Sequence, residues 1–210
     1  MKLLIFGASG GTGRELVQQA LAQRHAVTAF VRHPARFGVT HQYLTVATGD
    51  VIDPARVAQA VRGQDAVISA LGSARSLTHH PELVDGVRNI IAAMERERVR
   101  RLVNLSVLGV GRSGRQLGWL DRHVMVPLVL RNVVADHATR EELITRSDLD
   151  WVIVRPPRLT DGAHTGRYRS GDDVRERGMS ASISRADVAD FMLKQVADAR
   201  YVRGTPAVMY

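Results

Sequence analysis

Short apolar runs alternate with longer amphipathic stretches from the first residue to about residue 155. The apolar runs predict six buried strands, at residues 2–7, 26–31, 43–47, 65–71, 101–107 and 150–155. The stretches between them predict helices, the longest at residues 12–23, 81–98 and 133–146, and a short helix that opens at Asp53 and Pro54. Strands that alternate with helices specify an α/β fold, a doubly wound parallel sheet with helices on both faces.

The chain beyond residue 155 has a less regular pattern. Residues 160–177 are rich in Gly, Asp and Arg and predict a long surface loop. Residues 184–197 predict a last helix with Ser184 as its N-cap, and residues 206–210 predict an edge strand. No repeat, linker or low-complexity block interrupts the pattern, so residues 1–210 are expected to form a single domain.

A glycine-rich segment, GASGGTG at residues 7–13, joins the first predicted strand to the first predicted helix. Gly7 lets the chain turn sharply off the strand, Gly10 lets the backbone approach a pyrophosphate, and Gly13 lets the helix pack close to the sheet. The helix N-terminus adds N–H groups and the positive end of a dipole. In this position the segment predicts a Rossmann-like dinucleotide site. Its predicted cofactor contacts are Gly7, Ser9, Gly10, Gly11, Thr12 and Gly13.

The end of the second predicted strand distinguishes between the two nicotinamide dinucleotides. A carboxylate there binds the ribose hydroxyls of NAD, whereas an arginine accepts the additional phosphate of NADP. The sequence reads VRHPARF, with Arg32 just past the strand, Arg36 one turn later and no Asp or Glu nearby. Two guanidinium groups can bind a phosphate through paired hydrogen bonds. We therefore expect NADPH as the cofactor; the alternative is that both arginines are solvated surface residues.

Two further strand ends are expected to complete the cofactor site, because ligands of open parallel sheets bind outside the carboxyl ends of the strands. One follows the third strand, where the adenine would lie, and the other ends the fourth strand, near the nicotinamide ribose. The predicted contacts there are Asp50, Val51, Ala70, Leu71 and Gly72.

Composition narrows the class of protein. The chain has no cysteine, which excludes disulfides, thiolate metal sites and a thiol nucleophile. It lacks an apolar run long enough to span a membrane. The apolar run before Gly7 is too short for the core of a secretory signal, so a cytoplasmic location is expected. The net charge of +8 comes almost entirely from scattered arginines, which favours solvated faces over a nucleic-acid surface. His79-His80 and Asp172-Asp173 have no matching cluster, so no metal site is predicted.

With these residues in place, the chain resembles the atypical short-chain dehydrogenases/reductases, and among them the NADPH-dependent flavin reductase (biliverdin-IXβ reductase) family. The matching segments occur in family order over nearly the whole chain: IFGASGGTG, TAFVR, GDV, GQDAVISALG, NIIAAM, the DH pair at residues 136–137, VRPPRLTDG, TGRY and Tyr210. The glycine turn is shared by many relatives, whereas GQDAVI, the paired prolines and TGRY are more specific. The resemblance implies a hydride donor and a site open to flat conjugated acceptors.

The resemblance also implies candidate residues around the nicotinamide. It implies a serine at the end of the fifth strand, here Ser106, and it places Pro156 beside the cofactor. Ser106 would orient the nicotinamide or hydrogen-bond the acceptor, or else be a satisfied strand-end hydroxyl. The family has a histidine after the paired prolines, where this chain has Arg158. Arg158 would meet a phosphate or carboxylate of the substrate, or else be a solvated loop residue. Ser106 and Arg158 are the candidate catalytic residues.

One familiar acid–base pair is missing. Ordinary short-chain dehydrogenases use a tyrosine four residues before a lysine, and none of the tyrosines here, Tyr43, Tyr168, Tyr201 and Tyr210, has a lysine at that spacing. Alcohol–ketone chemistry by that route is therefore disfavoured. Hydride transfer to a flavin, quinone or bilin needs mainly stacking and orientation, which fits the absence of the pair.

Three functions follow from these features. The first is an NADPH-dependent oxidoreductase acting on a small conjugated acceptor, as a monomer or homodimer, with no nucleic-acid or membrane partner. The second is a non-catalytic NADP(H)-binding redox sensor. The third, a sugar-nucleotide epimerase or dehydratase, is disfavoured by the missing pair and by the short chain after residue 155. His137 is expected to be structural, and Trp119 to lie in the core or on a dimer surface.

Overall fold

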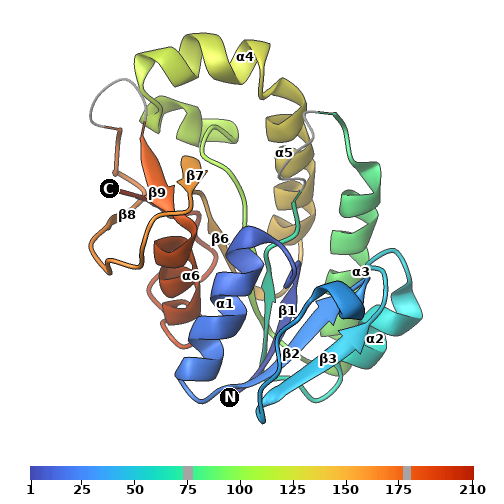
Figure 1. The fold of residues 1–210 in the computed structure, drawn as a ribbon. Helices are drawn as coiled ribbons and strands as arrows, with labels where there is room; N and C mark the ends of the chain where they lie inside the picture. The colour runs from blue at the N-terminus through green and yellow to red at the C-terminus, as the bar shows by residue number, and fades with distance from the viewer. Residues whose placement is uncertain (73–77, 177–180) are drawn as a thin grey trace.

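A parallel sheet of six strands runs through the centre of the computed structural model, which describes residues 1–72, 78–176 and 181–210 (Figure 1). In spatial order the strands are β3 (Leu44–Thr48), β2 (Ala26–Val31), β1 (Lys2–Phe6), β4 (Ala66–Ser69), β5 (Arg101–Leu105) and β6 (Asp150–Val154). The order reverses between β1 and β4, which is the switch point of a doubly wound sheet. The predicted fold class and all six predicted strands are confirmed.

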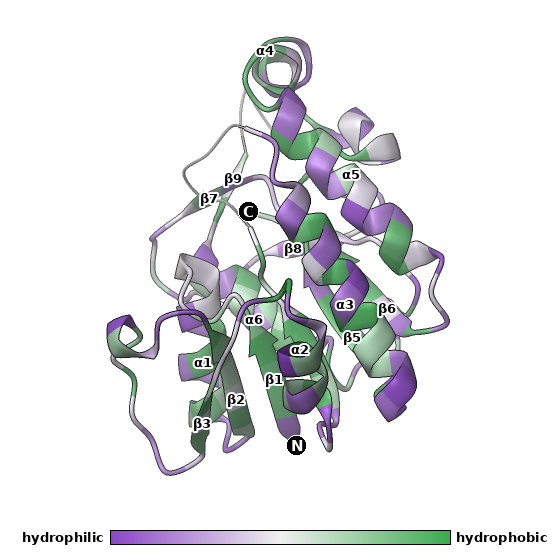
Figure 2. Ribbon diagram, turned by 90° about the vertical axis from the view of Figure 1, so that its right-hand side faces the viewer, coloured by the Kyte–Doolittle hydropathy of each residue, from purple (hydrophilic) through white to green (hydrophobic). Residues whose placement is uncertain are grey.

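Helices cover both faces of this sheet (Figure 1). Helices α1 (Gly11–Ala22) and α6 (Arg185–Lys194) pack together on one face, and α2 (Pro54–Val61), α3 (Pro81–Glu97) and α5 (Arg131–Thr145) cover the other. Figure 2 shows green, hydrophobic strands between helices that also carry purple, hydrophilic residues. No helix in the described part of the chain has both the length and the apolar composition to cross a membrane.

Strand β1 shows why the strands appear as continuous apolar runs in the sequence. Leu3 and Ile5 enter the core beneath α1 and α6, whereas Leu4 and Phe6 enter the core beneath α2 and α3. Successive side chains point to opposite faces, and both faces are buried, so neither position can be polar. Because all the strands of this sheet pair in parallel, their carboxyl ends lie along one edge of it.

The region beyond β6 contains more structure than the sequence predicts. The expected surface loop at 160–177 is wrong in part: β8 (Arg169–Gly171) lies within it and pairs antiparallel with β10 (Ala207–Met209), and Arg177 lies outside the described residues. Just before it, β7 (Arg158–Thr160) pairs with β9 (Ser182–Ser184). These strands have three residues each, too few to show alternation, and their partners are distant in sequence. Strand β10 confirms the predicted strand at 206–210, but it is buried.

Residues 111–128 form a helical segment that lies apart from the sheet (Figure 1). It consists of η2 (Gly111–Gln116), η3 (Asp121–Met125) and α4 (Val126–Leu128). Trp119 is 70% exposed, so its placement in the core is wrong, and its expected role in a dimer surface stays a prediction. Its ring stacks on His123, with centroids 5.5 Å apart, which leaves most of the indole in solvent.

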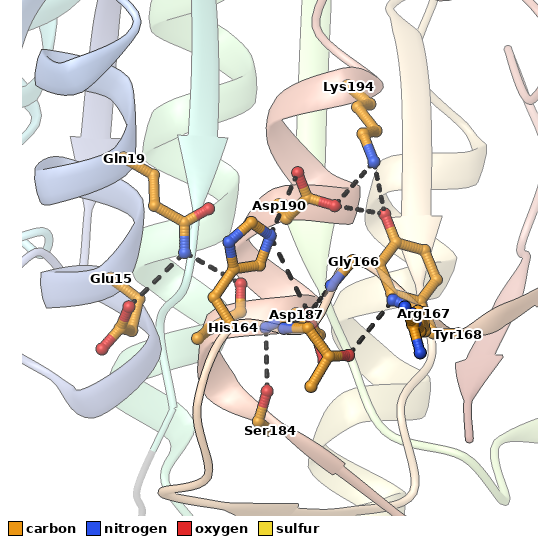
Figure 3. A network of polar contacts seen from close by, with 12 residues as sticks. Glu15, Gln19, His164, Gly166, Arg167, Tyr168, Ser184, Asp187, Asp190 and Lys194 are labelled. Atoms are coloured by element: carbon orange, nitrogen blue, oxygen red, sulfur yellow. Dashed lines mark hydrogen bonds and ion pairs between the residues drawn. The ribbon is translucent and has the colours of Figure 1, made fainter.

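A polar network ties the chain before β8 to helix α6 (Figure 3). The fully buried Asp187 carboxylate accepts hydrogen bonds from the N–H groups of Thr165 and Gly166 (2.8 Å each) and from the hydroxyls of Thr165 and Tyr210 (2.7 Å each). Ser184 caps α6 as predicted, accepting from the Asp187 N–H at 3.0 Å. Burial acts to raise the pKa of Asp187, but the hydrogen bonds outweigh it and lower that pKa to about 2.

Replacing Asp187 by Asn is expected to lower the free energy of unfolding by about 2–4 kcal/mol at pH 7, because the amide would turn a donor toward groups that already donate. The depressed pKa means that this contribution is present above the unfolded value near 4 and is lost as the pH falls toward about 2. Urea unfolding of wild type and Asp187→Asn should therefore show a difference that shrinks from pH 7 to pH 3. The exposed Asp173→Asn is the control, and a difference independent of pH would contradict the account.

Candidate functional site

The glycine turn lies where β1, β4 and α1 meet. Gly7 has φ +73°, and a Cβ on it would lie 2.5 Å from the carbonyl oxygen of Ala70 at the end of β4. A Cβ on Gly13 would lie 2.0 Å from the carbonyl oxygen of Gly7. Both distances are far below contact, so the sharp turn and the close helix approach expected of these glycines are present.

Gly10 has a different environment. It is the N-cap of α1 with an extended backbone, φ −73°, and no side chain caps the helix there. A Cβ on Gly10 would meet only the Gly7 carbonyl oxygen, at 3.3 Å, so the protein leaves space on its other side. The first turn of α1 carries no acidic residue, so its N–H groups and dipole are available to an anion.

A cleft of about 430 Å³ opens beside this turn. The predicted residues that line it come from the glycine turn and from the ends of β2, β3 and β4: Gly7, Ser9, Gly10, Arg32, Asp50, Val51, Ala70, Leu71 and Gly72. Residues that are distant in sequence are therefore brought to one cavity at the switch point of the sheet. This is the position at which open α/β sheets bind ligands.

The cleft also has lining residues that the sequence analysis missed: Phe30, Val31, Gly49, Ile52, His80, Glu82 and Leu83. The first four flank predicted contacts and could have been found from their strand ends. His80, Glu82 and Leu83 come from the start of α3, which no local pattern links to the glycine turn. The His80 Nδ1 atom lies 2.7 Å from the Glu82 carboxylate.

Other predicted cofactor contacts do not line the cleft. Thr12 and Gly13 are buried behind the turn, and a Cβ on Gly11 would meet the side chain of Arg185. Arg36 is exposed at the end of η1 (Pro34–Arg36), in the loop that follows β2 and begins with Arg32. Ser106 and Pro156 are buried at the carboxyl ends of β5 and β6.

Arg14, which the sequence analysis did not identify, holds the segment that carries Arg36. Its guanidinium donates to the carbonyl oxygens of Arg36 (3.1 Å) and Phe37 (2.9 Å), and it lies over the Phe37 ring at 5.6 Å. The first turn of α1 therefore fixes the loop after β2. Hydrogen bonds from Arg14 therefore connect the helix that follows the glycine turn to the loop that contains Arg36.

Ser106 belongs to a buried polar network. Its hydroxyl donates to the Glu141 carboxylate at 2.5 Å, and Glu141 forms a buried ion pair with Arg155. The His137 Nδ1 atom lies 3.3 Å from the same hydroxyl oxygen. Because Ser106 gives its only proton to Glu141, its oxygen accepts from the His137 N–H. Burial, helped by the charge of Arg140, lowers the pKa of His137 to about 3, so this imidazole is neutral at pH 7.

Arg158 lies on β7, directly after the buried Pro156 and Pro157, and its side chain is exposed. It stands beyond the carboxyl end of β6 and is not part of the cleft lining. A charged group in this position is free to meet a ligand that reaches past the cleft.

The structure brings together a tyrosine and a lysine that the sequence spacing separates (Figure 3). The Lys194 ammonium lies 3.1 Å from the Tyr168 hydroxyl. That hydroxyl donates to Asp190 at 2.6 Å, and burial together with this carboxylate raises the pKa of Tyr168 to about 12. An acid–base tyrosine needs a pKa near the working pH, so this pair is a structural contact.

Comparison with known proteins finds a matching family, a sequence relative and solved structures with a similar fold. A family model described as NAD(P)H-binding matches residues 7–199. The chain is 28% identical over 205 residues to the uncharacterized protein YwnB of Bacillus subtilis (strain 168), covering 93% of this chain and 92% of that protein. It is similar to the structure of ChuY, an anaerobillin reductase from Escherichia coli O157:H7, with a TM-score of 0.78, 27% identity, and coverage of 99% and 96%. A short-chain dehydrogenase/reductase from Veillonella parvula DSM 2008, solved with NADP, shares the fold at a TM-score of 0.79 and 18% identity, over 99% of this chain and 93% of that one.

Two glycine substitutions are expected to separate binding from folding. Gly10→Val should abolish dinucleotide binding and leave the melting temperature nearly unchanged, because Gly10 lines the cleft and a Cβ on it would meet only the Gly7 carbonyl oxygen. Gly13→Val should destabilise the fold itself, because its Cβ would lie 2.0 Å from the backbone of Gly7. The measurements are fluorescence titration with NADPH and thermal unfolding. A Gly10→Val protein with wild-type NADPH affinity would rule out the turn as the binding site.

Proposed function

Because the chain belongs to the NAD(P)H-binding family, we propose that it is an NADPH-dependent reductase that acts on a flat conjugated acceptor such as a flavin, quinone or bilin. The observation that supports this best is that one cleft contains the open face of Gly10, the end of β4 and Arg32. When bound there, NADPH supplies a hydride from C4 of its nicotinamide.

The preference for NADPH rests on the charge at the end of β2. Arg32 lines the cleft directly after this strand, where a carboxylate would otherwise hold the ribose hydroxyls of NAD. A guanidinium in this place favours the 2′-phosphate of NADPH through charge-assisted hydrogen bonds. Arg36 adds a second positive charge from the adjoining loop, whose backbone Arg14 holds through a hydrogen bond to the Arg36 carbonyl oxygen.

The proposed acceptor class follows from what the site can and cannot supply. Tyr168 is not among the residues that line the cleft, and its pKa of about 12 makes it a poor proton donor, which favours an acceptor that takes its proton from water. The chain then contributes by orientation: Ser106, fixed by Glu141, holds the end of β5 rigid beneath the nicotinamide. The similarity to an anaerobillin reductase supports a conjugated tetrapyrrole or a molecule of similar shape.

The test is NADPH oxidation by the purified protein with FMN, an uncharged quinone and a bilin, followed at 340 nm. A reductase turns over many equivalents of NADPH with at least one of these acceptors. A non-catalytic NADP(H) sensor binds the cofactor and stops, so tight NADPH binding without turnover on any acceptor would replace the proposed function by the sensor.

Arg32→Ala is expected to weaken NADPH binding by about ten- to hundredfold and to leave NADH binding nearly unchanged, because only NADPH carries a phosphate for the guanidinium. Titrations of both cofactors with wild type and variant give the ratio. Arg62→Ala removes an equal charge from an exposed position paired with Glu97 and should change neither affinity. Equal losses for NADPH and NADH in Arg32→Ala would mean that Arg32 does not contact the 2′-phosphate.

Two substitutions near the acceptor are expected to act on different kinetic constants. Ser106→Ala should lower kcat by about ten- to hundredfold with FMN and with an uncharged quinone alike, because it removes orientation and no acid catalyst. Arg158→Ala should raise the KM for FMN more than the KM for the quinone, because only FMN presents a phosphate. A Ser106→Ala protein without any activity would indicate an essential hydroxyl. Equal KM changes would remove Arg158 from the acceptor site.

A further inference from the structure

The inward face of helix α5 is charged where an apolar surface is expected. Its buried residues are His137, Arg140, Glu141 and Ile144, and Arg140 is only 4% exposed. Burying a guanidinium costs several kcal/mol, and an apolar side chain would fill the same space at lower cost. A charge retained in such a position requires a specific partner.

That partner is the carboxyl end of β4. The Arg140 Nη1 atom donates to the carbonyl oxygen of Leu71 at 2.9 Å, and Nε donates to the carbonyl oxygen of Asp136 at 3.2 Å. Burial lowers the pKa of Arg140, and the charges of Asp136 and Glu141 oppose that shift. One of these two hydrogen bonds therefore holds a backbone carbonyl in the wall of the cleft, that of Leu71.

Asp136, one turn earlier on α5, contacts the segment just before α3, which also lines the cleft. Its carboxylate accepts from the His80 N–H at 2.7 Å and lies 2.8 Å from His79 Nδ1. His80 and Leu71 both line the cleft. Helix α5 therefore fixes the end of β4 and the start of α3 from behind, although it contributes no lining residue of its own.

The bond to Leu71 also sets the direction of the next N–H group. A trans peptide is planar, and its C=O and N–H point in opposite directions. Since the Leu71 carbonyl points toward Arg140 on α5, the Gly72 N–H points away from α5. Gly72 lines the cleft, and apart from its chain neighbours no atom of the described residues lies within 4 Å of the position that its Cβ would take.

We propose that Arg140 is a positioning residue that turns the Leu71–Gly72 peptide so that the Gly72 N–H donates to an oxygen atom of the nicotinamide half of the cofactor. The inference rests on the proposed function, because it requires NADPH in this cleft with its nicotinamide ribose at the end of β4. It goes beyond that function by assigning the ligand contact to a backbone donor and its control to a buried arginine.

The test compares the affinity for NADPH with the affinity for a ligand that has only the adenosine half of the cofactor. The 2′,5′-ADP molecule carries the adenosine and the 2′-phosphate but lacks the nicotinamide ribose. Arg140→Met should raise the Kd for NADPH about tenfold, the effect of one lost hydrogen bond, and change the Kd for 2′,5′-ADP less than about twofold. Arg32→Ala should weaken both ligands. Arg146→Met, at the C-cap of α5 where the exposed Arg146 pairs with Glu142, should weaken neither.

Each other result has a definite meaning. Equal losses for NADPH and 2′,5′-ADP in a folded Arg140→Met protein would make Arg140 a general support of the fold and overturn the proposal, as would no loss at all. If Arg140→Met does not fold, Gly72→Pro removes the N–H itself: a selective loss of NADPH affinity supports the proposal, and unchanged affinity overturns it. Wild-type protein that binds neither ligand would overturn the proposed function, and the proposal with it.

Discussion

The backbone of Gly7 passes so close to the end of β4 that a single methyl group would collide with the Ala70 carbonyl, and the same backbone lies under the first turn of α1. Two strands and a helix therefore meet at a point where no side chain fits. This contact positions the α1 N-terminus beside the ends of β2, β3 and β4, which line one cleft. Fold and site share the constraint at Gly7 and Gly13, whereas a Cβ on Gly10 would meet only the Gly7 carbonyl oxygen, at 3.3 Å. The site is thus a consequence of how closely the central elements approach.

Several buried charged groups lie near the carboxyl ends of the strands and the start of α6. Glu141 and Arg155 form an ion pair beside Ser106, Arg140 holds the end of β4, and Asp187 gathers four hydrogen bonds near the start of α6. Such groups contribute little net stability compared with apolar packing, but each has a fixed geometry. Two of these contacts lie at the carboxyl ends of strands: Glu141 accepts from Ser106 after β5, and Arg140 donates to Leu71 after β4. In the proposed function, this fixed geometry would orient the reactants, which is the contribution that hydride transfer requires of a protein.

Local pattern was sufficient to predict the sheet, its helices and the core of the site. Continuous apolar runs identify doubly buried strands, and the glycine spacing identifies the turn, so Gly7, Gly10 and Arg32 were predicted together and line one cavity. The sequence could not reveal contacts that depend on distant segments. His80 reaches the cleft because Asp136 holds it, and Arg14 fixes a loop two elements away. Strands β7 to β10 are too short for periodicity, and Tyr168 meets Lys194 only through the tertiary fold.

In the proposed function, the cleft beside the glycine turn binds NADPH, with the nicotinamide end of the cofactor facing the carboxyl ends of β4 and β5. A crystal structure of the protein grown with NADP+ tests this most directly. The account predicts the pyrophosphate against the N–H groups at the start of α1, the 2′-phosphate within hydrogen-bond distance of Arg32, and the nicotinamide ribose at Gly72. Density for the cofactor elsewhere on the molecule, or a bound cofactor whose 2′-phosphate points away from Arg32, would contradict it.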